Sequence, residues 1–211
     1  MPLFREWTTD NDSLAAIWKI EEPEEFFTKH TGLTTDIKNE KRRLEHLTAR
    51  YLLKHLKADF PLMGIKKDAY DKPRIDDDKY FFSISHSWPY VAVMINEDEE
   101  VGIDIETWHP RIHEIQSKFL GPDEQALCED KRELITLAWS AKEAAFKWAG
   151  RAGVDFKEHL PISYLAISGE YYNINILCTL TSPNQMISLQ GLLDPDFSCV
   201  YVIAAQDWAI Y

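Results

Sequence analysis

The chain has 211 residues, of which 45% are hydrophobic and 27% are charged. This is the composition of a globular protein, and it excludes a disordered or collagen-like chain. Lys and Arg number 23 against 35 Asp and Glu, so the formal charge is −12. That acidic balance argues against a general binder of nucleic acid or of anionic membranes. The length fits one large domain or two small ones.

The three cysteines indicate buried, reduced thiols. Cys128, Cys178 and Cys199 are far apart and show no CxxC spacing, so a disulfide framework or a structural zinc site is not expected. Residues 1–19 contain charged side chains and no apolar run typical of a signal peptide. No stretch approaches the ~18–20 apolar residues of a membrane span. We therefore expect a soluble, cytoplasmic protein.

The first half of the chain predicts helices followed by strands. Residues 13–30 have helical character broken at Pro23, and residues 36–56 carry leucines at near-helical spacing. Residues 71–78 read as a loop. Three strand-like runs follow, and the polar turn at residues 96–99 predicts a hairpin between the last two. The runs are 81–85, 90–95 and 101–105.

The second half repeats this order. Residues 112–150 are helical with an interruption near Gly121 and Pro122, after which Asp123 and Glu124 suit the first turn of a helix. Four further strands are predicted. The order is typical of an α+β protein with an N-terminal half at residues 1–106 and a C-terminal half at residues 107–211. The four strands cover 164–167, 171–180, 186–192 and 199–204.

The helix predicted at residues 36–56 has a basic polar face. Between Lys38 and Lys57 there are seven lysines and arginines and two acids, a local charge of +5. Such a concentration on an acidic protein favours a site for an anion. A solvated helix face would show the same pattern.

Two carboxylates lie on one face of the strand at residues 101–106. Because side chains alternate along a strand, Asp104 and Glu106 project together and Ile103 and Ile105 point the other way. Carboxylates about 7 Å apart repel one another, and binding of Mg²⁺ is the simplest way to reduce this repulsion. Ordinary alternation on a solvent-facing strand is the alternative.

The segment Trp139–Lys147 allows two interpretations. Glu143 and Lys147 are i, i+4 neighbours in the orientation that favours an intrahelical ion pair. Alternatively, Lys142 and Lys147 neutralise a phosphate while Glu143 completes a metal shell or takes a proton. The spacing alone does not separate the two.

His86 lies within the serine-rich run at residues 82–87. If Ser83, Ser85 and Ser87 share one face of a strand, His86 points to the other face. A hydrolytic Ser–His pair between adjacent residues is then geometrically poor. His86 is better suited to donate a hydrogen bond to a phosphate, or to a structural role.

Taken in order, these segments resemble the 4'-phosphopantetheinyl transferase superfamily, specifically its surfactin-type (Sfp-like) branch. The resemblance covers about Lys41 to Gly153. It implies a pseudo-dimer of two similar α+β halves with the active site in the cleft between them, and a monomer in solution. The matching segments are Lys72-Pro73, Ser85-His86-Ser87, the GxDxE run 102–106 and the WxxKEAxxK run 139–147.

The resemblance also implies a reaction. Such enzymes transfer the 4'-phosphopantetheine arm of coenzyme A to a serine of an acyl or peptidyl carrier protein and release adenosine 3',5'-bisphosphate. Asp104, Glu106 and Glu143 would hold Mg²⁺ on the pyrophosphate. The general base would be Glu143, directly or through water, or else Glu124. Lys142, Lys147 and His86 would contact the phosphates, and Lys147 would alternatively protonate or stabilise the leaving phosphate. The coenzyme site would be completed by Arg43, Arg50, Lys72, Pro73 and Ser85.

Two other functions use the same residues. A metal-dependent phosphoesterase or nuclease could employ Asp104, Glu106 and Glu143, although the acidic charge disfavours a nucleic-acid substrate. A non-catalytic coenzyme-A-binding module is the second alternative.

Carrier proteins are themselves acidic as a family, so a transferase with this net charge needs a local basic or apolar docking patch.

Overall fold

The computed structural model describes residues 2–76 and 79–207 and divides the chain into two compact units, Met1–Val101 and Gly102–Tyr211. The sequence placed this boundary after Glu106. The difference arises because strand β7 (Ile103–Thr107) pairs with β11 (Phe197–Asp207) near the end of the chain. The strand that carries Asp104 and Glu106 therefore belongs to the second unit, a long-range pairing that sequence order does not reveal.

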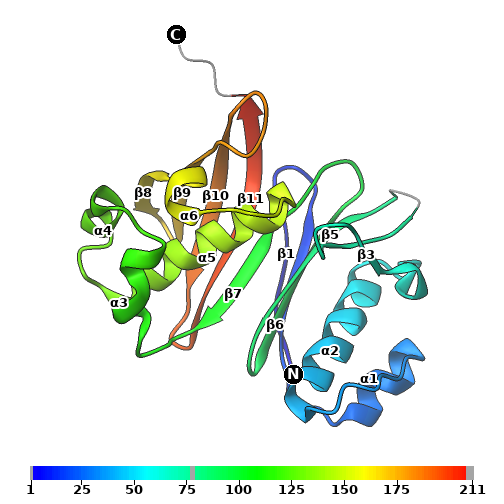
Figure 1. Cartoon of the computed structure of the whole chain (residues 1–211). Coiled ribbons are helices and arrows are strands. Elements are labelled where there is room, and N and C mark those ends of the chain that lie inside the picture. Colours follow the sequence, from blue (N-terminus) through cyan, green and yellow to red (C-terminus); the bar gives the residue numbers. More distant parts are fainter. Residues whose placement is uncertain (1, 77–78, 208–211) are drawn as a thin grey trace. The chain divides into compact units, whose positions relative to one another are not determined.

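The first unit is an antiparallel sheet in the order β1-β2-β6-β5, with helices on one face (Figure 1). Its core joins the apolar face of α2 to the sheet through residues such as Leu47, Leu53 and Val93. The elements are β1 (Leu3–Thr8), β2 (Leu14–Lys19), α1 (Glu24–Thr31), α2 (Glu40–Leu56), η1 (Leu62–Gly64), β3 (Lys66–Lys67), β4 (Pro73–Arg74), β5 (Phe81–Ser87) and β6 (Tyr90–Asn96).

Some predictions for the first unit are wrong and others are confirmed. Of the helical region predicted at residues 13–30, residues 14–19 form strand β2, which lies between β1 and β6 with four consecutive residues buried, whereas the part after Pro23 is helix α1. A continuous apolar run of this kind does not distinguish a strand from a helix by its periodicity. The hairpin predicted at residues 96–99 does not form, because β6 pairs with β2 and β5 instead of β7. The predicted basic helix is α2, whose N-cap Asn39 accepts from Arg42 N.

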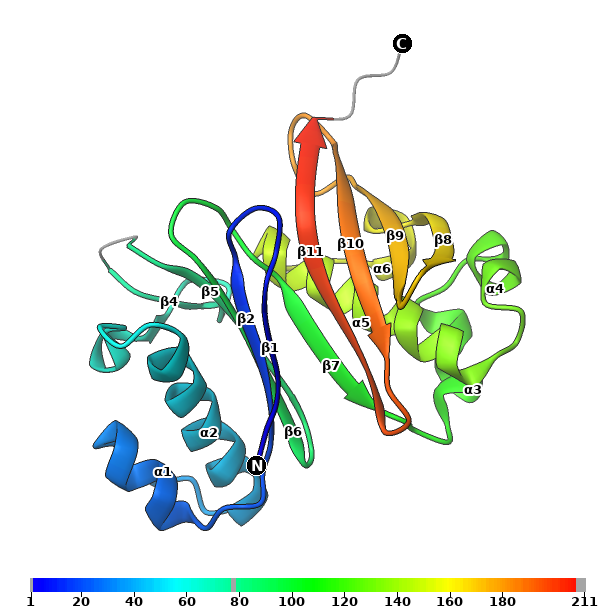
Figure 2. The same ribbon diagram turned by 180° about the vertical axis from the view of Figure 1, so that it is seen from behind.

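The second unit is a five-stranded antiparallel sheet in the order β7-β11-β10-β9-β8, packed against α5 (Figure 2). The predicted helical region and the four predicted C-terminal strands are confirmed. The α+β class is therefore confirmed as well. The remaining elements are α3 (Ile112–Ile115), η2 (Gln116–Lys118), α4 (Pro122–Leu127), α5 (Arg132–Ala149), α6 (Phe156–His159), β8 (Ile162–Ser168), β9 (Tyr171–Cys178) and β10 (Gln185–Leu193).

Small residues let α5 lie unusually close to the sheet. A Cβ atom at Gly102 would be 2.1 Å from the backbone oxygen of Ala144, and one at Gly191 would be 2.6 Å from Leu137 Cδ1. The hydroxyls of Ser140 and Ser198 meet at 2.9 Å. The GxDxE strand and the WxxKEAxxK helix are thereby brought into direct contact.

The cysteine prediction is confirmed: Cys128, Cys178 and Cys199 are free and buried. Burial raises the pKa of the Cys128 thiol to about 12. Within residues 2–76 and 79–207, no helix has the length and apolar character needed to cross a membrane.

The contact at Gly102 predicts a specific cost of adding one methyl group. Gly102→Ala would force the Ala144 carbonyl away from β7, and overpacking of this kind costs about 1–3 kcal/mol. We expect thermal unfolding at a lower temperature than in the parent protein. Gly64→Ala is the matched control, because its Cβ would meet only Pro61 Cβ at an ordinary 3.8 Å. Equal stability of the two variants would contradict the packing argument.

Candidate functional site

A charged cluster forms where β7 faces α5. Asp104 is 2% exposed, and Lys147 Nζ lies 2.6 Å from its Oδ1 and 3.3 Å from the carbonyl oxygen of Ile103. Lys147 thus binds the strand. The Glu143 carboxylate forms no hydrogen bond or ion pair with any residue that the structure describes. The intrahelical Glu143–Lys147 pair that the spacing allows is therefore not formed.

The carboxylates of this cluster act on one another. Burial is the main cause that raises the pKa of Glu143, the charge of Asp104 adds to it and Glu106 contributes less, while Lys147 acts in the opposite direction; the result is about 7. Half of the Glu143 side chains are consequently protonated near neutral pH. Carboxylates held close together in this way favour the binding of a further cation beside them.

The donor set matches the chemistry of Mg²⁺, a hard cation that takes carboxylate oxygens and retains other positions for water and phosphate. Three carboxylates contribute to the electrostatics of the site. In the described parts of the chain, however, no group of three or more His, Cys, Asp or Glu side chains is gathered closely enough to hold a metal ion. In this geometry, the ammonium of Lys147 is the cation that contacts Asp104.

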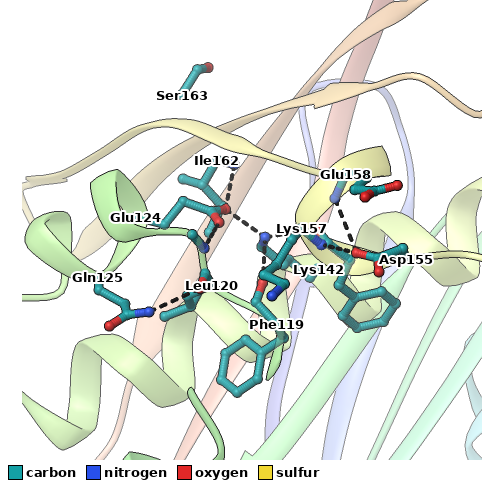
Figure 3. A network of polar contacts seen from close by, with 12 residues as sticks. Phe119, Leu120, Glu124, Gln125, Lys142, Asp155, Lys157, Glu158, Ile162 and Ser163 are labelled. Atoms are coloured by element: carbon teal, nitrogen blue, oxygen red, sulfur yellow. Dashed lines mark hydrogen bonds and ion pairs between the residues drawn. The ribbon is translucent and has the colours of Figure 1, made fainter. Parts of the chain in front are cut away.

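Lys142, which the sequence predicted to contact a phosphate, is bonded to other residues of the second unit. Its side chain is fully buried, and Nζ lies 2.5 Å from Glu124 Oε1 and 2.8 Å from the carbonyl oxygens of Phe119 and Phe156 (Figure 3). These three acceptors match the three hydrogens of an ammonium group. Desolvation lowers the pKa of Lys142, although the partner carboxylate opposes this effect.

Glu124, the second predicted general base, also has several partners. Its Oε1 also accepts from Ile162 N at 2.8 Å, and its Oε2 accepts from Gly121 N at 2.6 Å. The Lys142–Glu124 pair thus joins α5 to the start of α4, to β8 and to the segment before α4 (Figure 3). Both residues thus connect elements of the second unit.

An aromatic pocket adjoins Glu106. Trp139 Nε1 donates to Glu106 Oε1 at 3.3 Å, and the indole lies 4.9 Å from the Phe119 ring and 5.4 Å from the Phe156 ring, measured between centroids. The cavity has a volume of about 370 Å³ and is also lined by Ile115, Lys118, Val154 and Asp155. The sequence analysis missed this pocket, because Phe119 and Phe156 lie far from Trp139 in the chain.

The basic cavity of the first unit is the second candidate site. It has a volume of about 610 Å³ and lies between α2, β3 and β5. Burial and the neighbouring Arg50 lower the pKa of His46 to about 4, so this ring is neutral at pH 7. The lining residues are Ile37, Arg42, Glu45, His46, Ala49, Arg50, Ile65, Lys66, Lys67, Pro73, Ile84 and His86.

Three of the predicted coenzyme-binding residues line this basic cavity, namely Arg50, Pro73 and His86. The prediction missed Arg42 and Lys66, among others. Arg42, His46 and Arg50 stand four residues apart, so the helical period alone could have identified this stripe. His86 shares its strand face with Ile84, as the alternation predicted.

Three further predicted coenzyme-binding residues, Arg43, Lys72 and Ser85, do not line this cavity. Arg43 Nε pairs with Glu24 Oε2 at 2.7 Å, and its Nη1 donates to the Ile37 carbonyl at 2.9 Å. Lys72 Nζ lies 2.7 Å from Glu100 Oε2 in a largely buried position. Ser85 is buried, and alternation along β5 turns it away from the face of His86. In this structure the three side chains therefore do not line the basic cavity.

The comparisons with known proteins agree with the motif pattern. Residues 100–185 match the family model described as the 4'-phosphopantetheinyl transferase superfamily. The matched segment contains β7, α5 and the whole carboxylate cluster. A comparison with curated proteins finds no match.

The raised pKa of Glu143 predicts how stability depends on pH. The folded protein binds the Glu143 proton more tightly than the unfolded chain, whose pKa is 4.5, so stability is lost as pH rises from 4.5 through about 7. At pH 8 without divalent metal, Glu143→Gln should raise the free energy of unfolding by up to about 3 kcal/mol. The variant should therefore unfold at a higher temperature than the parent. Glu133→Gln on the same helix is the control, since the pKa of Glu133 is lowered. A stabilisation that is equal at pH 4 and pH 8 would refute the cluster.

The Lys142–Glu124 pair predicts a large stability effect. Lys142→Met leaves a buried carboxylate without its cation and should cost about 3–5 kcal/mol in urea unfolding. Lys142→Met combined with Glu124→Gln should recover part of this loss, because the buried charge is removed as well. Lys157→Met is the control, since Lys157 is exposed. No loss in the Lys142 variant would mean that the pair does not stabilise the unit.

Proposed function

We propose that the protein is a Mg²⁺-dependent 4'-phosphopantetheinyl transferase. It takes the phosphopantetheine arm from coenzyme A and attaches it to a serine of an acyl or peptidyl carrier protein. The observation that carries the proposal is the cluster of Asp104, Glu106, Glu143 and Lys147, which lies inside the segment that matches this superfamily. The surfactin-type branch, a monomeric chain and a cytoplasmic location are part of the same proposal.

The basic cavity supplies a site for the adenosine bisphosphate part of coenzyme A. Arg42, Arg50, Lys66 and Lys67 offer four cations to its phosphates, and arginine in particular binds phosphate through paired N–H groups. Apolar side chains from Ile37, Ile65 and Pro73 offer surface to the base. This use explains why an acidic protein concentrates positive charge on α2.

The aromatic pocket supplies a site for the pantetheine arm. The arm carries a gem-dimethyl group and two amides, and the pocket presents aromatic surface next to polar Lys118 and Asp155. Trp139 links the pocket to Glu106. An arm bound there would leave its phosphate end close to the carboxylate cluster.

The reaction forms a bond between the serine Oγ and the β-phosphorus of coenzyme A. The bond to the bridging oxygen breaks, and adenosine 3',5'-bisphosphate leaves with the electron pair. Asp104, Glu106 and Glu143 would hold Mg²⁺, which supplies charge neutralisation on the pyrophosphate oxygens. The Lys147 ammonium, which lies 2.6 Å from Asp104 Oδ1, would add positive charge for a phosphate bound at this cluster. The serine proton passes to Glu143, directly or through water.

The test is to incubate the protein with coenzyme A, Mg²⁺ and an apo carrier protein, and to weigh the carrier by intact mass spectrometry. We expect a gain of one phosphopantetheine arm that disappears when the metal is chelated. Asp104→Asn should lower the rate at least a hundredfold, because it removes one charge from the cluster around the transferred phosphate. The fold should remain intact by circular dichroism.

The controls separate this function from its alternatives. Asp123→Asn alters an exposed acid of the matched segment outside the cluster and should leave the rate unchanged. Coenzyme A binding without transfer to several unrelated carriers would instead indicate a non-catalytic binding module. Phosphoester cleavage with Mg²⁺ alone would indicate a phosphoesterase. Either result would overturn the proposal.

A further inference from the structure

An acidic residue lies inside the basic cavity of the first unit. Glu45 on α2 is 7% exposed and lines the same cavity as Arg42, Arg50 and Lys66. Burying a carboxylate costs free energy unless a partner compensates it. A negative charge at this place also opposes the binding of an anion. A carboxylate at this position therefore requires a partner that compensates its charge.

His86 is the partner of Glu45. His86 Nδ1 lies 3.2 Å from Glu45 Oε2, and across the described residues no other side chain is bonded to the Glu45 carboxylate. The two residues come from different elements, α2 and β5. The His86 side chain is 51% exposed, in contrast to the buried carboxylate beneath it.

The contact divides the two nitrogens of the imidazole between two tasks. A carboxylate accepts only from a protonated nitrogen, so a hydrogen bond across this contact requires the proton on Nδ1. Nε2 lies on the opposite edge of the ring, and His86 lines the cavity together with its cations. A ring that carries both protons donates from Nε2 to an anion while Nδ1 remains bonded to Glu45.

We propose that Glu45 is a positioning residue that holds His86 in the orientation in which Nε2 donates to a phosphate group bound in the basic cavity. With coenzyme A as the source of that phosphate, the inference rests on the proposed function. The charge of the phosphate is then met by Arg42 and Arg50 of α2 and by Lys66 and Lys67 of β3, while His46 stays neutral.

The first experiment measures the affinity for adenosine 3',5'-bisphosphate by calorimetry at fixed pH and salt. His86→Ala should weaken binding by about five- to tenfold, the value of one hydrogen bond to a charged group. Glu45→Leu should cause a similar loss, and the double variant should lose no more than either single one. Glu45→Gln should retain most of the affinity, because its amide oxygen still accepts from Nδ1. Glu40→Gln, an exposed acid of the same helix, is the control.

The second experiment observes His86 directly by nitrogen-15 NMR of the ligand-free full chain. We expect a protonated Nδ1 in the parent protein and in Glu45→Gln, and loss of this signature in Glu45→Leu. Additive affinity losses in the double variant, or an unchanged His86 spectrum in Glu45→Leu, would overturn the proposal. If Glu45→Leu fails to fold, the parent is compared with Glu45→Gln instead. Loss of both the Nδ1 signature and the affinity in Glu45→Gln would contradict a positioning contact.

The two experiments also separate this inference from the proposed function. A parent protein that binds neither adenosine bisphosphate nor coenzyme A would refute the assigned ligand. The NMR signature of the Glu45–His86 contact would still stand or fall by itself, because it is recorded without a ligand.

Discussion

The close approach of α5 to β7 is the constraint on which the candidate active site depends. At Gly102 the backbone oxygen of Ala144 occupies the place where any other residue would carry its Cβ. Only with this separation does Lys147 reach Asp104 at 2.6 Å and Glu143 experience the charges of both strand carboxylates. The glycine of the GxDxE run is therefore required for packing, whereas the two acids after it are required for the chemistry of the site. One motif thus contains two kinds of requirement.

The WxxKEAxxK helix shows how far a motif can be read without a structure. Lys142 and Lys147 are five residues apart, which places them about 140° apart around a helix axis, so they face different surroundings. Lys147 reaches the strand, whereas Lys142 is enclosed by Glu124 and two carbonyl groups. Helical periodicity could have shown that the two lysines do not share a face. It could not have shown which one is buried, because Phe119 and Phe156 reach Lys142 only through the folded loops.

The same distinction holds for the fold. Helix α2 and the strands after residue 160 follow from local patterns, since amphipathic periodicity and alternation are properties of neighbouring residues. Strand β2 and the partner of β7 do not, because burial on both faces and pairing across the chain depend on distant segments. In the basic cavity, the helical stripe of Arg42, His46 and Arg50 was within reach of sequence analysis. Lys66 and Lys67 join it only because a short two-stranded ribbon returns to α2.

The burial of the three cysteines has a consequence for the proposed substrate. Coenzyme A and the transferred arm both end in a free thiol, and thiols exchange with disulfides only through the thiolate form. With a pKa of about 12, Cys128 forms almost no thiolate at neutral pH, and Cys178 and Cys199 are equally enclosed. An enzyme that handles thiol-terminated molecules would in this way avoid becoming covalently trapped by them. The inert cysteines then serve as protection against mixed disulfides, in addition to filling the core.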